Sequence, residues 1–298
     1  MSGFETYFGE AMALLTAVVW ALAVILFRKS GEAVHPIGLN LFKNALAVIL
    51  FIPTAWLFGE VILRPAPVGD YLLLFLSGAL GIGIADTLFF KSLNALGAGL
   101  IAIVDCLYSP FIICLSMLWL GDTLSLWQWL GVILIVSAVL SVMGERNNAS
   151  IDRRAISLGI LWGVLALASM AVGIVMIKPL LEHSPLIWAT EMRLIGGLAV
   201  LAVVLLFHPS RLRIIASIRS TRRWKYTLSG SFLGAYISMI LWLAGMKYAQ
   251  ASTASALNQT SNIFIFIFAA LLLKEKITPL RLAAIVVGVA GAMMVTFG

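Results

Sequence analysis

Long apolar runs dominate this chain, and only short polar connections separate most of them. Ten runs are long enough to be membrane spans, at residues 10–27, 36–58, 71–91, 97–120, 125–143, 157–177, 185–207, 227–247, 253–273 and 279–297. A helix needs about 20 apolar residues to cross a hydrocarbon core about 30 Å thick. The runs are continuous and do not alternate apolar with polar residues, which favours helices over a β-barrel. The pattern predicts an all-α polytopic membrane protein with ten transmembrane helices.

The composition excludes other classes of protein. Of 298 residues, 62% are hydrophobic and only 11% are charged, and the mean hydropathy is +1.06. A soluble domain carries about 25% charged residues, and disordered chains carry more still. The ten runs use nearly the whole chain, so no sizeable soluble domain remains. The first run follows a leader with Glu5 and Glu10 but no Lys or Arg, so we expect a retained helix and not a signal peptide.

The chain repeats itself about a polar linker at residues 144–156. Three features recur in the same order at an offset of 149 to 153 residues. A proline is followed by a cation inside the next span, at Pro36 with Lys43 and at Pro185 with Arg193. A span then starts with small residues, at 96–99 and 249–252, and ends with an acidic residue, Asp122 and Glu275. Because each half holds five spans, the second half must enter the membrane in the opposite orientation. The sequence therefore predicts two inverted five-helix repeats, residues 1–146 and 147–298, an architecture typical of alternating-access transporters.

With these features the chain resembles a ten-helix member of the drug/metabolite transporter superfamily, of the type with two EamA-like repeats. The resemblance rests on Trp20, the two proline-to-cation patterns, the small-residue starts, and the span-end residues Gly121, Asp122, Glu275 and Gly291, and it covers essentially the whole chain. It implies export or exchange of amino acids and other small metabolites through a central cavity. Asp122 stands where the family usually has Glu, and Lys43 where Arg is usual; both keep the sign of the charge.

Ionisable residues inside the spans are the first candidates for a binding site, because charges in the hydrocarbon are costly and normally face partners or water. Five lie well inside predicted spans: Lys43, Asp86, Asp105, Glu191 and Arg193. Lys43 and Arg193 are mates in the repeat, and either capture an anion such as a carboxylate or tie helices together. Glu191 and Arg193 are two residues apart and on different faces, so at least one of them needs a partner elsewhere.

The two aspartates leave more than one interpretation open. Asp86 and Asp105 are candidates for proton coupling, since a buried carboxyl group without a cation nearby takes up a proton readily. Pairing with Lys43 or Lys91, or binding of a substrate amine, is the alternative.

Uncharged polar residues mark the fourth and ninth spans, which correspond in the repeat. Tyr108 and Ser109 follow Asp105 in the fourth span, and Pro110 frees a backbone carbonyl there. The ninth span carries Asn258, Gln259, Ser261 and Asn262. These stripes either line a cavity as opposing walls or join helices. Three further deep aromatic residues, Trp20, Tyr236 and Trp242, wall the cavity or pack in the core.

The net charge of +7 indicates orientation. Fifteen Lys and Arg lie on one side of the predicted topology, three on the side that holds both termini, and two inside spans. The positive-inside rule then places both termini outside the cytoplasm, for a multi-pass protein of the plasma (inner) membrane. The basic loop 208–226 is either an amphipathic helix on the lipid surface or a solvated loop.

No catalytic signature accompanies these features. The sequence contains no HExxH, P-loop, GxSxG or Cys/His cluster, so we expect no enzyme activity, no cofactor, no metal and no nucleic-acid partner. The leading hypothesis is a secondary transporter, monomeric or homodimeric in the bilayer, that exports or exchanges small polar metabolites, amino acids first. An organic-phosphate or nucleotide-sugar exchanger is the alternative, favoured if Lys43 and Arg193 share one anion. A structural or assembly protein of the membrane is the alternative of another class.

Overall fold

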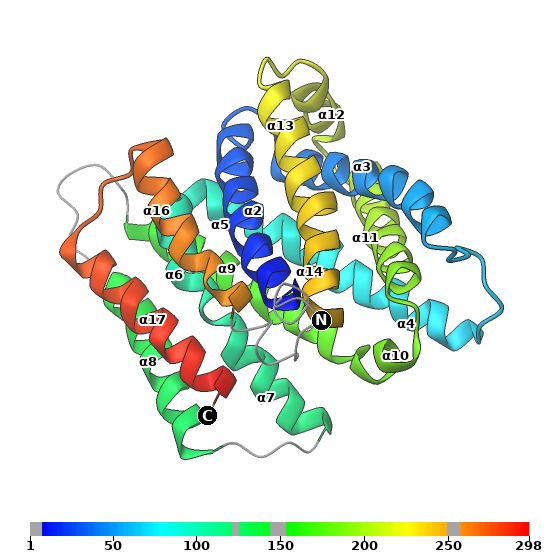
Figure 1. The fold of residues 1–298 in the computed structure, drawn as a ribbon. Helices are drawn as coiled ribbons and strands as arrows, with labels where there is room; N and C mark the ends of the chain where they lie inside the picture. The colour runs from blue at the N-terminus through cyan, green and yellow to red at the C-terminus, as the bar shows by residue number, and fades with distance from the viewer. Residues whose placement is uncertain (1–7, 121–124, 144–152, 249–256, 298) are drawn as a thin grey trace.

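A computed structural model describes residues 8–120, 125–143, 153–248 and 257–297, and in that part of the chain all regular secondary structure is helical. The first half forms α2 (Phe8–Ser30), α3 (Pro36–Leu57), α4 (Val68–Gly78), η1 (Ala79–Ile84), α5 (Ala85–Leu96), α6 (Ala98–Asp105), α7 (Tyr108–Leu120) and α8 (Leu126–Met143). The second half forms α9 (Arg153–Val175), α10 (Lys178–His183), α11 (Leu186–Phe207), α12 (Arg211–Arg219), α13 (Trp224–Ser231), η2 (Phe232–Ile237), α14 (Ser238–Tyr248), α16 (Ser261–Leu273) and α17 (Pro279–Phe297). Figure 1 shows them as one helical bundle.

These elements match the ten predicted spans. Eight helices of the described residues are long and apolar enough to cross a membrane, and three of the eight are composites, at Val68–Leu96, Ala98–Trp119 and Trp224–Gly245. The fifth and ninth spans contribute the shorter apolar helices Leu126–Ser141 and Leu257–Leu273. The prediction of an all-α polytopic membrane protein is therefore confirmed.

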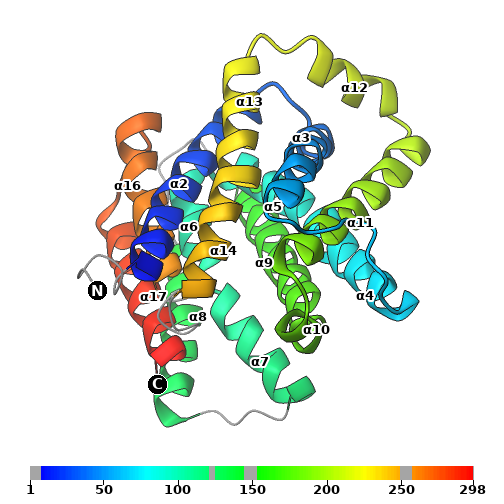
Figure 2. The ribbon, with the colours of Figure 1, turned by 45° about the vertical axis from the view of Figure 1, so that its right-hand side comes forward.

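Corresponding helices of the two repeats run antiparallel. His35 precedes α3 and His208 follows α11, yet their imidazole rings lie only 6.1 Å apart, so the start of one helix meets the end of the other. In the same way, Gln128 near the start of α8 donates a hydrogen bond of 3.3 Å to the carbonyl of Val295 near the end of α17. Figures 1 and 2 show α8 and α17 side by side. This arrangement is the inversion that an odd number of spans per repeat requires.

The third and eighth spans each contain a π-helical segment, which the sequence pattern did not predict. η1 and η2 begin 153 residues apart, at the same position of the two repeats. A wide turn leaves backbone carbonyls without their usual donors. In the first repeat the side chain of Asn40 donates from Nδ2 to the carbonyls of Ile82 (2.9 Å) and Gly83 (3.0 Å). The segment is thus held by a buried amide on α3.

The fourth span is interrupted in its middle, so the continuous helix expected at 97–120 is corrected. α6 ends at Asp105 and α7 begins at Tyr108. Pro110 has no N–H to bond the carbonyl of Cys106, which explains why the helix breaks there. In the ninth span, Thr260 interrupts the helix 153 residues after Leu107. Both repeats therefore carry a broken helix in the same span.

Glycines permit the closest contacts between helices. A Cβ on Gly78 of α4 would lie 1.8 Å from the carbonyl oxygen of Arg193 on α11, and one on Gly196 would lie 2.4 Å from the carbonyl oxygen of Phe75. No side chain larger than hydrogen fits at either position. This close packing fixes where α11 presents Arg193.

The basic loop contains a helix, α12. Ile214 is 1% exposed and packs with Ile218 beside Gly38 of α3, while Arg211 and Arg213 are exposed. The loop therefore contains a helix that packs Ile214 and Ile218 on the bundle, which differs from both the lipid-surface helix and the solvated loop that the sequence left open. It lies at the opposite end of the bundle from the C-terminal end of α17 (Figure 1).

Candidate functional site

A buried ion pair lies at the junction of α3 and α5. Nζ of Lys43 is 2.5 Å from Oδ2 of Asp86, and the two side chains are only 8% and 12% exposed. The ammonium group also lies over the ring of Phe90, 5.9 Å from its centroid. Asp86 is the second residue of α5, directly after η1, so the π-helical segment sets its position. Among the alternatives for Asp86, the structure shows pairing with Lys43.

Arg193 has a different environment. Its Nε donates a 3.0 Å hydrogen bond to Oγ of Ser77 on α4, and Ser77 donates in turn to the carbonyl of Gly173 on α9. A Cβ on Gly81 would be 3.5 Å from Nη2, so Gly81 lies beside this side of the guanidinium. Within the described residues the guanidinium makes no ion pair. Arg193 is thus a positioned cation whose terminal nitrogens remain available.

Opposite charges lie on either side of Tyr108, at the break of the fourth span. The Tyr108 side chain is within electrostatic range of both Arg193 and Asp105, and Arg193 is also within range of Asp86. Arg193, Asp105 and Tyr108 lie deep in the bundle but keep part of their surface accessible. The structure therefore brings five of the predicted site residues near one another, namely Lys43, Asp86, Asp105, Tyr108 and Arg193, and the last three are only partly buried.

The two broken helices contact each other at their breaks. Gln259 donates from Nε2 to Oγ of Ser109, and Asn262 donates from Nδ2 to Sγ of Cys106 at 3.6 Å. The side-chain oxygens of Asn258 and Asn262 have no hydrogen-bond partner within the described part of the chain. The ninth span therefore brings unsatisfied polar atoms next to the residues around Tyr108.

The other predicted residues lie apart from this group. Trp20 packs against Phe89, with ring centroids 6.4 Å apart. Tyr236 shares a 2.8 Å hydrogen bond with the hydroxyl of Thr54, and Trp242 packs against the same apolar cluster as Tyr236. Glu191 is 1% exposed and faces away from Arg193. No contact in the described structure joins these four residues to Arg193.

Sequence reasoning missed the residues that position the charges. Ser77 and Gly173 hold Arg193, and Asn40 holds η1 in front of Asp86. The signal for Asn40 was present, because Asn40, Lys43 and Asn44 are three and four residues apart and form a polar stripe on one face of an apolar span. Nothing in the sequence indicates Ser77, a single hydroxyl in a run of leucines.

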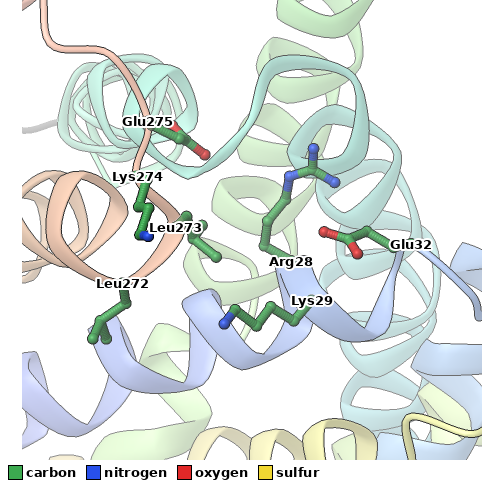
Figure 3. Close-up of a pocket in the computed structure, with 7 residues that line it drawn as sticks. All are labelled: Arg28, Lys29, Glu32, Leu272, Leu273, Lys274 and Glu275. Carbon is green, nitrogen blue, oxygen red and sulfur yellow. The ribbon is translucent and has the colours of Figure 1, made fainter.

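A cavity of about 240 Å³ opens where α2 and α16 end (Figure 3). It is lined by Arg28, Lys29, Glu32, Leu272, Leu273, Lys274 and Glu275. Glu275 accepts hydrogen bonds of 2.8 Å from the backbone N–H groups of Ala98 and Gly99, the first residues of α6. Gly97 precedes them with φ +83°, a left-handed conformation that favours glycine. This cavity therefore marks a junction of the two repeats at a helix end, separate from the group around Arg193.

Two histidines cap the helices that carry the intramembrane cations. Nδ1 of His35 accepts a 3.3 Å hydrogen bond from the N–H of Ile37 at the start of α3, and Nδ1 of His208 accepts one of 3.0 Å from the N–H of Ser210. Burial, together with His208 and Lys91 nearby, lowers the pKa of His35 below its usual value of 6.5. His35 is therefore neutral at physiological pH, and its Nδ1 is free to accept.

Metal chemistry finds no support in the described residues, where no three His, Cys, Asp or Glu side chains gather as ligands. Comparison with known proteins points instead to transport. The profile of the EamA-like transporter family matches residues 7–144 and 157–297, once in each half.

Three curated proteins are similar over most of this chain. An uncharacterized transporter of Archaeoglobus fulgidus is 25% identical over 90% of this chain and 90% of its own length. An uncharacterized transporter of Methanothermobacter thermautotrophicus is 29% identical over 76% of this chain and 63% of its own. A chloroplastic WAT1-related protein of Arabidopsis thaliana is 26% identical over 100% of this chain and 72% of its own.

A solved protein structure shares the fold, with a TM-score of 0.65 at 17% identity over 99% of this chain and 96% of its own. The two family matches cover both five-span halves, the helices cross the membrane in matching positions, and charged side chains gather at the interruptions of those helices. The chain belongs to the EamA-like transporter family, and is a multi-pass membrane transporter.

Proposed function

We propose that this transporter exports or exchanges small polar metabolites, amino acids in particular, by alternating access through a central cavity between the repeats. The observation that carries the proposal is Arg193, a guanidinium deep in the membrane with no ion pair in the described structure. A buried cation without a counter-ion is costly, and an anionic ligand supplies that counter-ion. The planar fork of arginine suits a carboxylate, which it binds through two hydrogen bonds.

The charges around Tyr108 favour a zwitterion. Arg193 and Asp105 both act on Tyr108, and all three residues are only partly buried. An amino acid would place its carboxylate on Arg193 and its ammonium group toward Asp105. A phosphate ester brings about two negative charges, and it would need a second free cation. Lys43 is already paired with Asp86, which favours the amino acid over an organic phosphate.

The remaining predicted residues are proposed as the walls of the same cavity. Asn258, Gln259 and Asn262 would offer amide groups from the ninth span, opposite Tyr108. Trp20, Tyr236 and Trp242 would form the wall or its support, whereas Glu191, which the sequence also suggests, lies outside the proposed wall because it is 1% exposed. Asp86 and Asp105 are proposed to bind and release protons during transport, as the sequence suggests.

Inverted repeats support the alternating-access part of the proposal. Each repeat, 1–146 and 147–298, would move against the other, opening the cavity to one side at a time. The antiparallel pair α3 and α11 carries Lys43 and Arg193, one from each repeat. The end of the bundle that holds α12 would face the cytoplasm, and both termini would lie outside. A phosphatase reporter that works only outside the cytoplasm should therefore be active when it is fused to the C-terminus. A fluorescent reporter that works only in the cytoplasm should give no signal at the same position.

Uptake into proteoliposomes tests the function. We expect a panel of labelled L-amino acids to identify at least one that enters and exchanges, and Arg193→Gln to abolish that uptake in folded protein. The matched control is Arg223→Gln, which removes an arginine that is partly exposed and paired with Glu32 at the surface; it should transport normally. Exchange of labelled inorganic phosphate without any amino-acid flux would overturn the proposed substrate class, and normal uptake by Arg193→Gln would overturn the proposed site.

A further inference from the structure

Glu191 is a buried carboxyl group that the site around Arg193 does not use. It is 1% exposed, and neither of its carboxylate oxygens has a hydrogen-bond partner among the described residues. Its helix neighbours on the same face, Ile187 and Leu194, pack into an apolar cluster with Ala47 and Phe51 of α3. Glu191 therefore lies in the apolar layer between α3 and α11.

No charged group of the described residues neutralises it. α3 contributes Lys43, which is paired with Asp86. The other elements packed on α11 include η1, which has no titratable residue, and α4 and α12, whose groups are Asp70, Tyr71, Arg211, Arg213 and Arg219. η2 and α14 share its apolar cluster and contribute Tyr236, whose hydroxyl shares a 2.8 Å hydrogen bond with Thr54, while Glu60 and Arg64, before α4, both contact Trp188. Tyr71 donates to the carbonyl of Arg64, and none of these groups acts on the Glu191 carboxylate.

An ionised carboxylate in these surroundings would have lost its water and gained no donor. An isolated carboxylate is strongly destabilised when it is transferred from water into an apolar medium, so such a group exists as the neutral acid. Asp86 differs because it has a cation at 2.5 Å, and Asp105 differs because part of its surface stays accessible. Glu191 is thus a carboxyl group of the described spans that has no counter-ion and whose two oxygens are both buried without a hydrogen-bond donor.

We infer that Glu191 is a further proton-carrying group of the transport cycle, beside Asp86 and Asp105, protonated in this conformation and ionised in another. The inference rests on the proposed function, because a transport cycle must separate α3 from α11 to admit water. The O–H bond of the Glu191 carboxyl then breaks, its proton passes to water, and the carboxylate remains until the next closure returns a proton. Glu191 is five residues, about 8 Å, from the start of α11. That end lies on the side of the termini, which are predicted to be outside.

Proteoliposomes loaded with the pH dye pyranine test the coupling. A mixture of labelled L-amino acids should drive proton movement through the wild-type protein. Glu191→Gln, which resembles the neutral acid in shape and charge, should fold and still exchange labelled for unlabelled amino acids. We expect its proton movement to fall to that of protein-free liposomes. The control Glu32→Gln removes an exposed carboxylate and should leave proton movement unchanged.

Infrared difference spectroscopy provides a measurement that needs no substrate. At neutral pH the wild type should show a protonated-carboxyl band that Glu191→Gln lacks and Asp105→Asn retains. Absence of that band, or proton movement in Glu191→Gln equal to the wild type, overturns the inference. If exchange persists without proton movement in the wild type, coupling fails while the proposed transport function stands. If the band is present but no amino acid exchanges, the proposed substrate class fails and the neutral carboxyl is retained.

Discussion

The ion pair between Lys43 and Asp86 gives the sharpest test of how the interior is stabilised. Replacing Lys43 with Met keeps most of the volume of the side chain and removes its charge. Two unit charges 2.5 Å apart attract by about 7 kcal/mol at an effective dielectric constant of about 20. Desolvation of two ions that are 8% and 12% exposed offsets much of that attraction. Loss of one partner leaves Asp86 buried without a counter-ion, so we expect Lys43→Met to lower the free energy of unfolding by about 3–5 kcal/mol.

Removing both charges should recover part of this loss, because no buried ion is then left alone. We expect Lys43→Met with Asp86→Leu to be more stable than the sum of the single variants by about 1–3 kcal/mol. Unfolding in mixed micelles with increasing SDS measures both free energies. Arg223→Gln is the matched control, since it breaks a pair of similar length, 2.6 Å, whose side chains are 40% and 43% exposed. Its loss should stay below about 1 kcal/mol. Equal losses for Lys43→Met and Arg223→Gln would refute the reasoning.

Three further predictions concern packing and helix ends. Gly78→Ala should abolish folding, because its Cβ would lie 1.8 Å from a carbonyl oxygen. The control Gly69→Ala places a Cβ that meets nothing within 4 Å, so this variant should elute as monodisperse protein in gel filtration. Glu275→Ala should lower the free energy of unfolding by about 1–2 kcal/mol, measured in SDS, since two N–H groups of α6 lose their acceptor. The pKa of His35 is lowered in the folded state, so unfolded protein binds protons more readily, and stability should fall as the pH drops below about 6.5. In His35→Asn the asparagine still caps the helix but does not titrate. The fall in melting temperature between pH 7.5 and pH 5.5 should therefore be smaller for this variant than for the wild type, and an equal fall would contradict this.

The sequence was enough to predict the spans, since apolar length alone decides what crosses a bilayer, and Pro110 marked the break of the fourth span. The π-helical segments η1 and η2 were not predictable, because a wide turn has no residue signature and depends on a buried amide such as Asn40. The pairing of Asp86 stayed open for a similar reason. Periodicity predicts on which face of its helix Asp86 lies, but only the packing of α3 on α5 decides whether Lys43 reaches Asp86.

The difference between the two repeats explains why charge accumulates where it does. η1 and η2 lie at equivalent positions, so Asp86, the second residue after η1, corresponds to Met239, the second residue after η2. Lys43 in the first repeat therefore has an acid to pair with, whereas Arg193, its mate in the second repeat, has an uncharged thioether at the equivalent position. Inversion relates the two repeats, the second repeat lacks this acid, and Arg193 has no ion pair in the described structure. Ser77 contacts Arg193 through a 3.0 Å hydrogen bond, so replacing Ser77 with Asp should supply a partner for Arg193, and amino-acid uptake should fall although the protein still folds. Uptake equal to the wild type, with Arg193→Gln still inactive, would show that the free charge of Arg193 is not what binds the substrate.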